Sequence, residues 1–229
     1  MPKFYPLNLY SHYSLLRSLL RPQEIAKFLV KKEYGAAAIV DFNSLANSLK
    51  HLEFCDKEGI KGIIGTTIWI DSGWVNLIAK NRAGWINLIN LQTRANSEKN
   101  YLKGKPSLSI LDLEELKTNN IIVMSGNPYS DIHSLFFEDF NNEKIMARLR
   151  LYQMLFGVDF YVQINRINQN DKAYADRLRD YSKSLGIKTV AAAQCFYDSP
   201  SQKKQLEILI LSNLKSTYKN YNKALINNK

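Results

Sequence analysis

Cysteines and long apolar runs are scarce in this sequence of 229 residues, and each absence narrows the class of protein. Two cysteines, Cys55 and Cys195, are too few for a disulfide scaffold, and their separation argues against a thiolate zinc site. No apolar run approaches the roughly 20 residues of a membrane-spanning helix, and no signal-peptide stretch follows the first six residues. We therefore expect a cytoplasmic protein without a membrane segment. With 45% apolar residues, the chain can still bury a sizeable core.

Acidic residues are scarce at both ends of the chain. Residues 1–32 hold six basic residues and one acid, residues 201–229 again hold six and one, and the segment between them balances at 19 to 19. The net charge of +10 therefore comes from the two ends. Such ends suit an acidic partner, either nucleic acid or an acidic protein. A solvated Lys-rich surface explains them equally well, because no Arg-rich run or base-stacking aromatic pattern accompanies the charge.

Strand-like and helix-like segments alternate along the chain. Apolar runs predict strands at 4–10, 36–41, 60–69 (two runs around Gly65), 74–79, 121–124, 159–164 and 187–193. Amphipathic spacing predicts helices at 22–33, 44–57, 85–94, 143–156, 171–185 and 205–214. This alternation indicates a mainly parallel sheet covered by helices, and the length favours a closed or distorted barrel. In such folds the chemistry lies at the C-terminal ends of the strands.

Seven short segments at or near these strands follow one another in a recognisable order. They are Ser11-His-Tyr-Ser-Leu-Leu with Leu20-Arg-Pro, Val40-Asp-Phe-Asn-Ser-Leu, Gly59-Ile-Lys-Gly-Ile-Ile-Gly, Leu77-Ile-Ala-Lys-Asn-Arg-Ala-Gly-Trp-Ile-Asn-Leu, Met124-Ser-Gly, Phe156-Gly-Val-Asp-Phe-Tyr-Val and Val190-Ala-Ala-Ala-Gln-Cys-Phe-Tyr. The set resembles the PHP (polymerase and histidinol phosphatase) domain of the bacterial DNA polymerase III alpha subunit. That family's patterns are HxHSxYSLLDG with LRP, TDHGNL, GIKPIIG, LLAKNEEGYRNL, LSG, FGDDFYLE and VATNDVHY.

The resemblance implies an α/β fold, a distorted TIM-like (βα)7 barrel of the PHP type. It runs from about Phe4 to Pro200. We therefore expect a PHP-like barrel domain at 1–200, followed by a C-terminal helix and basic tail at 201–229.

Active PHP domains hold a trinuclear metal site built from His, Asp, Glu and sometimes Cys. The resemblance places those ligand positions on Asn8, Tyr10, Arg17, Asp41, Phe42, Thr67, Trp74, Asn127, Ile167, Gln194 and Phe196. Only Asp41 keeps a carboxylate, and Arg17 adds a positive charge. The three large rings at Phe42, Trp74 and Phe196 are expected to fill the cavity together. Divalent ions need several anionic or imidazole ligands, so we expect no metal, no cofactor and no catalytic residue.

Other candidates for chemistry are weak. The three histidines lie on different predicted elements, where a surface or capping role is the ordinary one. Asp41 is expected to pair either with Arg17 or in an ordinary surface contact. Cys195 stands at a strand end, but the sequence positions no base to activate its thiol.

The resemblance and its departures together imply a non-catalytic PHP-like domain that acts as a structural or docking module in DNA replication. The expected partner is the polymerase core or a separate proofreading exonuclease. The length leaves no room for polymerase palm, thumb or fingers, so both a piece of a longer alpha subunit and a free-standing relative fit. Two alternatives stay open: a PHP-type metal-dependent phosphoesterase or exonuclease with an altered site, and a DNA-binding module that uses the basic ends.

Overall fold

The computed structural model describes residues 4–97, 100–102, 105–115, 120–139, 141–166 and 171–214. The fold is α/β, and the chain divides into two compact units. The terminal unit comprises residues 1–63 and 194–229, and the central unit comprises residues 64–193. No helix in the described parts of the chain combines the length and apolar character that a membrane crossing requires.

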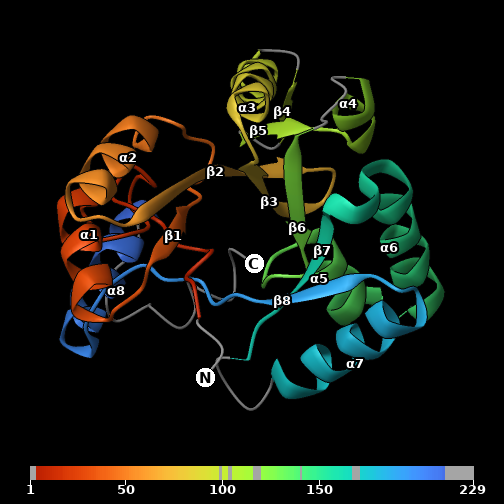
Figure 1. The fold of residues 1–229 in the computed structure, drawn as a ribbon. Coiled ribbons are helices and arrows are strands. Elements are labelled where there is room, and N and C mark those ends of the chain that lie inside the picture. Colours follow the sequence, from red (N-terminus) through yellow and green to blue (C-terminus); the bar gives the residue numbers. More distant parts are fainter. Residues whose placement is uncertain are drawn as a thin grey trace. The chain divides into compact units, whose positions relative to one another are not determined.

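The terminal unit is built from helices around a short strand (Figure 1). Its elements are α1 (Pro22–Lys31), β1 (Ala36–Ile39), α2 (Ser48–Lys57), the 3-10 helix η4 (Pro200–Gln202) and α8 (Lys203–Asn213). Helix α1 begins with a proline, and its Glu24 carboxylate accepts the Arg21 N–H, which caps the first turn. Apolar residues from α1, β1 and α2 form its core, among them Leu29, Ile39 and Cys55.

The segment before α1 enters this core without forming a strand. Within residues 4–10, only Leu9 pairs, through isolated parallel bridges to Ile39 and Cys195. The expected strand at 4–10 is therefore wrong as a regular element. The bridges nevertheless hold residues 9–10 beside β1 and beside Cys195. The Tyr10 N–H donates to the Cys195 carbonyl at 3.1 Å.

The central unit carries most of the sheet. Its elements are β3 (Gly73–Ala79), α3 (Arg82–Ala95), β4 (Tyr101–Leu102), β5 (Lys105–Leu108), α4 (Ile110–Glu115), β6 (Ile121–Ser125), α5 (Asp131–Ser134), the π-helix η2 (Leu135–Asp139), α6 (Asn142–Phe156), the 3-10 helix η3 (Gly157–Asp159), β7 (Phe160–Ile164), α7 (Asp171–Ser184) and β8 (Lys188–Ala191). Strand β2 (Lys61–Ile70) contains the boundary between the units. The strand order is β4-β5-β2-β3-β6-β7-β8, and β1 pairs with β2.

Strand direction follows the connections. Helices α6 and α7 link β6, β7 and β8, which are parallel, and both helices lie against that part of the sheet (Figure 1). Strand β3 instead runs antiparallel to both β2 and β6. The expected parallel arrangement is thus wrong at β3, because only Asp71 and Ser72 separate it from β2 and a connection this short makes a hairpin. Asp71 adopts the left-handed conformation that the turn requires, with φ at 51°.

One glycine in the central unit holds a helix close to a loop. A Cβ built on Gly84, in the first turn of α3, would lie 2.1 Å from the Asn120 carbonyl oxygen. Ala normally stabilises a helix relative to Gly. Here the added methyl group would overlap the Asn120 carbonyl, so helix and loop would have to move apart.

We expect Gly84→Ala to lower the free energy of unfolding by about 2 kcal/mol, against the usual helix propensity. Urea denaturation followed by circular dichroism measures this. Asn90→Ala, at an exposed position of the same helix, is the matched control and should be neutral or raise stability by about 0.5 kcal/mol. A stabilised Gly84→Ala protein would contradict the close packing.

Candidate functional site at the strand ends

Asp41 follows β1 in the terminal unit, and its carboxylate is 2% exposed. It accepts three hydrogen bonds of 2.6 Å: from the Ser11 N–H and the Ser11 hydroxyl, and from the Ser14 hydroxyl. Burial raises the pKa of the Asp41 carboxyl, and the serine hydrogen bonds oppose that rise. The carboxylate therefore anchors the loop that carries both serines.

Three aromatic rings lie beside this anchor. Tyr10 is fully buried, and its ring stacks on Phe42 at 4.5 Å and on Phe196 at 4.8 Å between centroids. The centroids of Phe42 and Phe196 are 6.4 Å apart, with planes 9° from parallel. The three rings therefore form one contiguous aromatic group, with all centroids within 6.4 Å of one another.

Polar and charged groups complete this stack. The Arg17 guanidinium lies 4.8 Å from the Phe42 centroid, a cation–π distance. The Gln194 amide reaches the Tyr10 hydroxyl at 3.4 Å. Asn8 is buried, and its backbone carbonyl accepts the Cys195 N–H.

In the central unit, side chains from neighbouring strands bond to one another. The Thr67 hydroxyl donates to Asn76 at 2.8 Å, and the Asn127 amide lies 3.5 Å from the same oxygen. The Asn76 amide donates to Gln163 at 3.2 Å, and Gln163 donates to the Ala192 carbonyl at 2.7 Å. All four side chains are fully buried and uncharged. We name Thr67, Asn76, Asn127 and Gln163 the amide network.

Trp74 also belongs to the central unit. It is 6% exposed, and its ring contacts Trp69 edge to face, with centroids 5.2 Å apart. Phe42 and Phe196 are neighbours in the terminal unit. Trp74 packs on Trp69 in the central unit. Ile167, the remaining family ligand position, lies outside the described residues.

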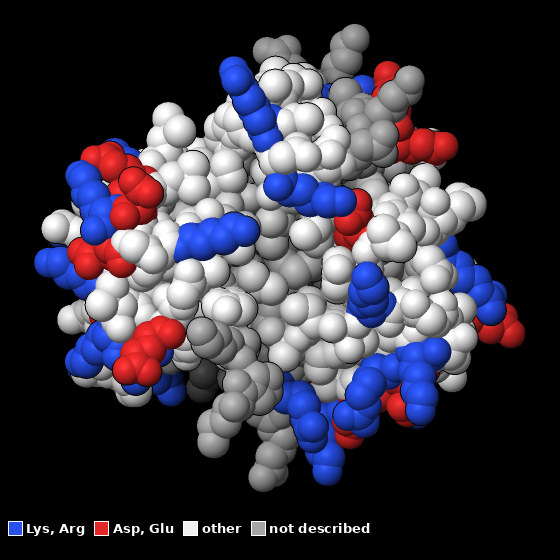
Figure 2. Space-filling model, in the orientation of Figure 1, with Lys and Arg blue, Asp and Glu red and all other residues white. Residues whose placement is uncertain are grey.

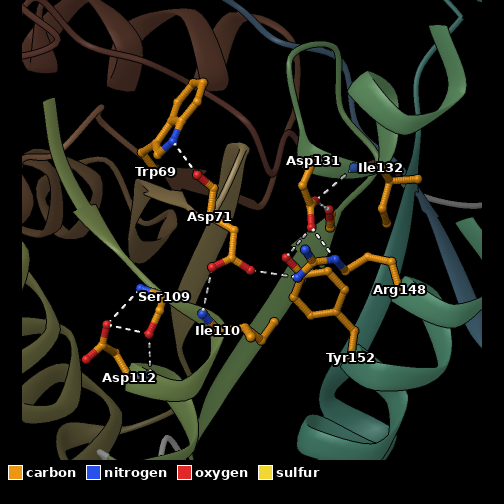
Figure 3. Close-up of polar contacts among 10 residues, drawn as sticks. Trp69, Asp71, Ser109, Ile110, Asp112, Asp131, Ile132, Arg148 and Tyr152 are labelled. Carbon is orange, nitrogen blue, oxygen red and sulfur yellow. Dashed lines mark hydrogen bonds and ion pairs between the residues drawn. The ribbon is translucent and has the colours of Figure 1, made fainter. Parts of the chain in front are cut away.

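A second polar cluster, fully buried only at its inner end, links the β2–β3 turn to α5 and α6 in the central unit (Figure 3). The Arg148 guanidinium pairs with Asp71 at 2.8 Å and with Asp131 at 3.4 Å. The Asp131 carboxylate also accepts hydrogen bonds from the Tyr152 hydroxyl at 2.9 Å and the Ser125 hydroxyl at 3.0 Å. Burial raises the pKa of Asp131, which the Arg148 charge opposes. We name Asp71, Asp131, Arg148 and Tyr152 the arginine cluster.

The outer end of the arginine cluster is tied to backbone. The Ile110 N–H donates to the Asp71 carboxylate at 3.2 Å, and the Trp69 indole N–H donates to the Asp71 carbonyl at 3.0 Å (Figure 3). These contacts hold three elements around one guanidinium, so the cluster is suited to a structural role.

The remaining ionisable candidates are held in ordinary contacts. Burial raises the pKa of the Cys55 thiol to about 11 and also raises the pKa of Cys195, which disfavours the reactive thiolate at either position. The Cys195 thiol donates to the Tyr197 carbonyl at 3.3 Å. His51 is buried and contacts the Ala37 carbonyl at 3.2 Å. In the described parts of the chain, no three His, Cys, Asp or Glu side chains group closely enough to hold a metal ion.

Comparison with known proteins decides the family. The profile of the PHP domain matches residues 6–167. The chain belongs to the PHP domain family. This PHP domain is also similar in sequence to DNA polymerase III alpha subunits. The alpha subunit of Buchnera aphidicola subsp. Acyrthosiphon pisum is 29% identical over 240 residues, and the match covers 96% of this chain and 20% of that protein. The corresponding subunit of Aquifex aeolicus is 25% identical, covering 93% and 20%. The chain thus spans about a fifth of the length of these relatives.

Solved structures share the PHP fold at low sequence identity. A proposed metal-dependent phosphoesterase from Bifidobacterium adolescentis superposes with a TM-score of 0.63 at 11% identity, covering 87% of this chain and 90% of that one. An amidohydrolase from Chromobacterium violaceum, solved with sulfate and without metal, gives 0.56 at 11% identity, covering 90% and 96%. At this identity the likeness concerns the fold alone.

Several residues of this PHP domain were not anticipated from sequence. Asn76 and Gln163 had a detectable signal, because each interrupts an apolar strand, in Trp74-Val-Asn-Leu-Ile and Phe160-Tyr-Val-Gln-Ile. Ser11 and Ser14 lie in a quoted motif, but their partner Asp41 is 27 to 30 positions away. The arginine cluster had no sequence signal, since its members lie on separate elements with no shared spacing.

Proposed function

We propose that this PHP domain is non-catalytic and serves as a structural or docking module in DNA replication. The observation that carries the proposal is the state of the family ligand positions. Side chains there contact each other: Tyr10 with Phe42 and Phe196, Arg17 with Phe42, and Thr67 and Asn127 with Asn76. The positions that hold metal ligands in active relatives are occupied here by side chains that pack and form hydrogen bonds.

The chemistry of the donor set does not fit a cluster of divalent ions. Among the described family positions, Asp41 is the one carboxylate, and N–H and O–H donors point at its two oxygens. The lone pairs that accept these hydrogen bonds are therefore not free to coordinate a metal ion. Amides, a phenol and a guanidinium supply too little negative charge to offset the desolvation of such an ion. We derive no hydrolytic step for this chain.

The proposal includes the finer architecture and the cellular setting. We place a distorted (βα)7 PHP barrel at 1–200 and a C-terminal helix with basic tail at 201–229, in a cytoplasmic protein. Residues 215–229 of that tail lie outside the described residues. The proposed partner is the polymerase core, a separate proofreading exonuclease, or both, because the matching relatives are DNA polymerase III alpha subunits.

A hydrolysis assay tests the non-catalytic part. The purified chain is incubated with manganese or zinc and either bis-p-nitrophenyl phosphate or an end-labelled single-stranded oligonucleotide. The expected rate equals that of the Asp41→Ala variant prepared in parallel. A wild-type rate that exceeds the variant's rate and disappears with chelator would contradict the proposal and favour the phosphoesterase alternative.

The net charge of the terminal unit is the observation that favours the DNA-binding alternative. The terminal unit holds 15 Lys and Arg against 8 Asp and Glu, a net +7, while the central unit holds 16 against 13, a net +3. Most of the excess in the terminal unit comes from residues 1–3 and 215–229, which lie outside the described residues, because the described part holds 10 Lys and Arg against 8 Asp and Glu. On the face drawn in Figure 2, however, acidic side chains are interspersed with the basic ones over α1 and α2. Binding to DNA would reveal itself by an affinity that falls steeply with salt.

A further inference from the structure

Two leucines in the terminal unit are presented to solvent by a fixed loop. Leu15 is 78% exposed and Leu16 43%, and Leu15 is the most exposed large apolar side chain among the described residues. They follow Ser14, whose hydroxyl binds Asp41. We name residues 11–17 the leucine loop. Isolated surface leucines need no explanation, but two adjacent ones in a loop held by hydrogen bonds do.

The leucine loop is held at several points. The Ser14 N–H donates to the Ser11 carbonyl, the Arg17 N–H donates to the Ser14 carbonyl at 3.0 Å, and the His12 N–H donates to the Leu20 carbonyl at 2.7 Å. Beside it, the Ser18 hydroxyl donates to the Tyr10 carbonyl at 2.6 Å. With the three bonds to Asp41, these contacts fix the backbone that presents the leucines. Order of this kind lowers the entropy lost when a partner binds.

The loop also stores strain at one of the two leucines. Leu16 has φ at 58°, in the left-handed region that is unfavourable for a bulky side chain. Strained backbone persists where surrounding contacts impose it, and it concentrates at ligand-binding and switch segments. Here the strained residue is one of the exposed leucines.

The rim of the leucine loop is basic. Arg17 ends the loop, and the Lys50 ammonium of α2 donates to the Tyr13 hydroxyl at 2.8 Å. Of the acids near the loop, Asp41 is buried under the serines, and Glu53 of α2 pairs with Lys57 at 2.6 Å and also interacts electrostatically with Lys50. The described residues of the unit hold 10 Lys and Arg against 8 Asp and Glu, a net +2. Charge complementarity therefore calls for a partner with carboxylates.

We propose that the leucine loop is a docking surface for a protein segment that offers apolar side chains to Leu15 and Leu16 and Asp or Glu side chains to Arg17 and Lys50. This inference rests on the proposed docking function and assigns it a surface and a partner chemistry. An acidic apolar peptide fits better than nucleic acid, because Leu15 and Leu16 offer no ring on which a base can stack, and the two rings of the loop, His12 and Tyr13, pack on each other with centroids 4.5 Å apart.

The probe is a display library of random 12-residue peptides, selected on the full chain and counter-selected on the double variant Leu15→Ser/Leu16→Asn. Asn tolerates the left-handed backbone at position 16, and circular dichroism checks that the variant is folded. Enriched peptides should combine aliphatic or aromatic residues with Asp or Glu. A synthetic peptide from this set should bind the double variant at least tenfold more weakly, and binding should weaken with salt.

Val30→Ser, at an exposed position of α1, is the matched control and should bind like wild type. The inference is overturned if no peptide distinguishes wild type from the double variant, if the distinguishing peptides are basic, or if an oligothymidylate binds in a leucine-dependent way instead. Failure of the proposed function would look different: it would be metal-dependent hydrolysis by the wild-type chain, which leaves the peptide result unaffected.

Discussion

Replacing Arg148 with methionine is expected to lower the free energy of unfolding by about 3 kcal/mol. The guanidinium bridges two carboxylates of the central unit, and Asp131 is fully buried. Without it, the Asp131 charge keeps the hydrogen bonds from Tyr152 and Ser125 but loses its cation. Methionine preserves most of the packing volume, so the loss reports the charge rather than a cavity. Urea denaturation followed by tryptophan fluorescence measures the difference.

The pH dependence of this deficit has a definite sign. Burial already raises the pKa of Asp131, and removing the guanidinium raises it further. A carboxyl whose folded pKa exceeds its unfolded pKa stabilises the fold at low pH, and that contribution is lost as pH rises through the folded pKa. The loss of unfolding free energy caused by Arg148→Met should therefore be smaller at about pH 5 than at about pH 8. Arg150→Met, at an exposed position of α6, is the control and should change stability by less than about 0.5 kcal/mol. Equal losses in both variants would contradict the cluster.

Replacing Asp41 with alanine is expected to cost about 2–3 kcal/mol, and the cost should be the same with and without chelator. The substitution leaves the Ser11 N–H and the hydroxyls of Ser11 and Ser14 without their acceptor in a buried place. If Asp41 is a hydrogen-bond anchor, divalent ions are irrelevant to its contribution. Denaturation curves in EDTA and in manganese measure this.

Asp56→Ala removes an exposed acid of α2 and is the control for Asp41→Ala, with an expected change below about 0.5 kcal/mol. A wild-type protein that manganese stabilises, beside an Asp41→Ala protein that it does not, would show that the carboxylate ligates metal. That outcome would contradict the anchoring role.

The sequence predicted the parts of the fold that depend on local pattern. The alternation from β6 through α6, β7 and α7 to β8 was expected within a few residues, because apolar period marks the elements and Gly157 and Gly186 follow the two helices. The direction of β3 was missed, since nothing in an apolar run states which way a strand pairs. Residues 4–10 looked like a strand but pair only at Leu9, where tertiary contacts override a weak local preference.

The residue types at the candidate site could be predicted from the sequence, but the contacts between their side chains could not. The resemblance indicated that Asp41 would be a lone carboxylate among ring and amide side chains, and that comparison needs only residue types. It did not indicate that Ser11 and Ser14 would bind Asp41, or that Asn76 would receive the Thr67 hydroxyl, because such partners meet only in the folded chain. Asp131 and Arg148 illustrate the limit: burial turns two ordinary surface residue types into a coupled pair.

The central claim, that this PHP domain has exchanged metal ligation for packing, is tested most directly by counting bound metal. The full chain and its Asp41→Ala variant are dialysed against manganese, zinc or iron(II), and the bound metal is measured by inductively coupled plasma mass spectrometry. We predict that neither protein retains metal in stoichiometric amount and that the two are indistinguishable. One or more ions per wild-type chain, lost in the variant and located by anomalous scattering beside Asp41, would contradict the account.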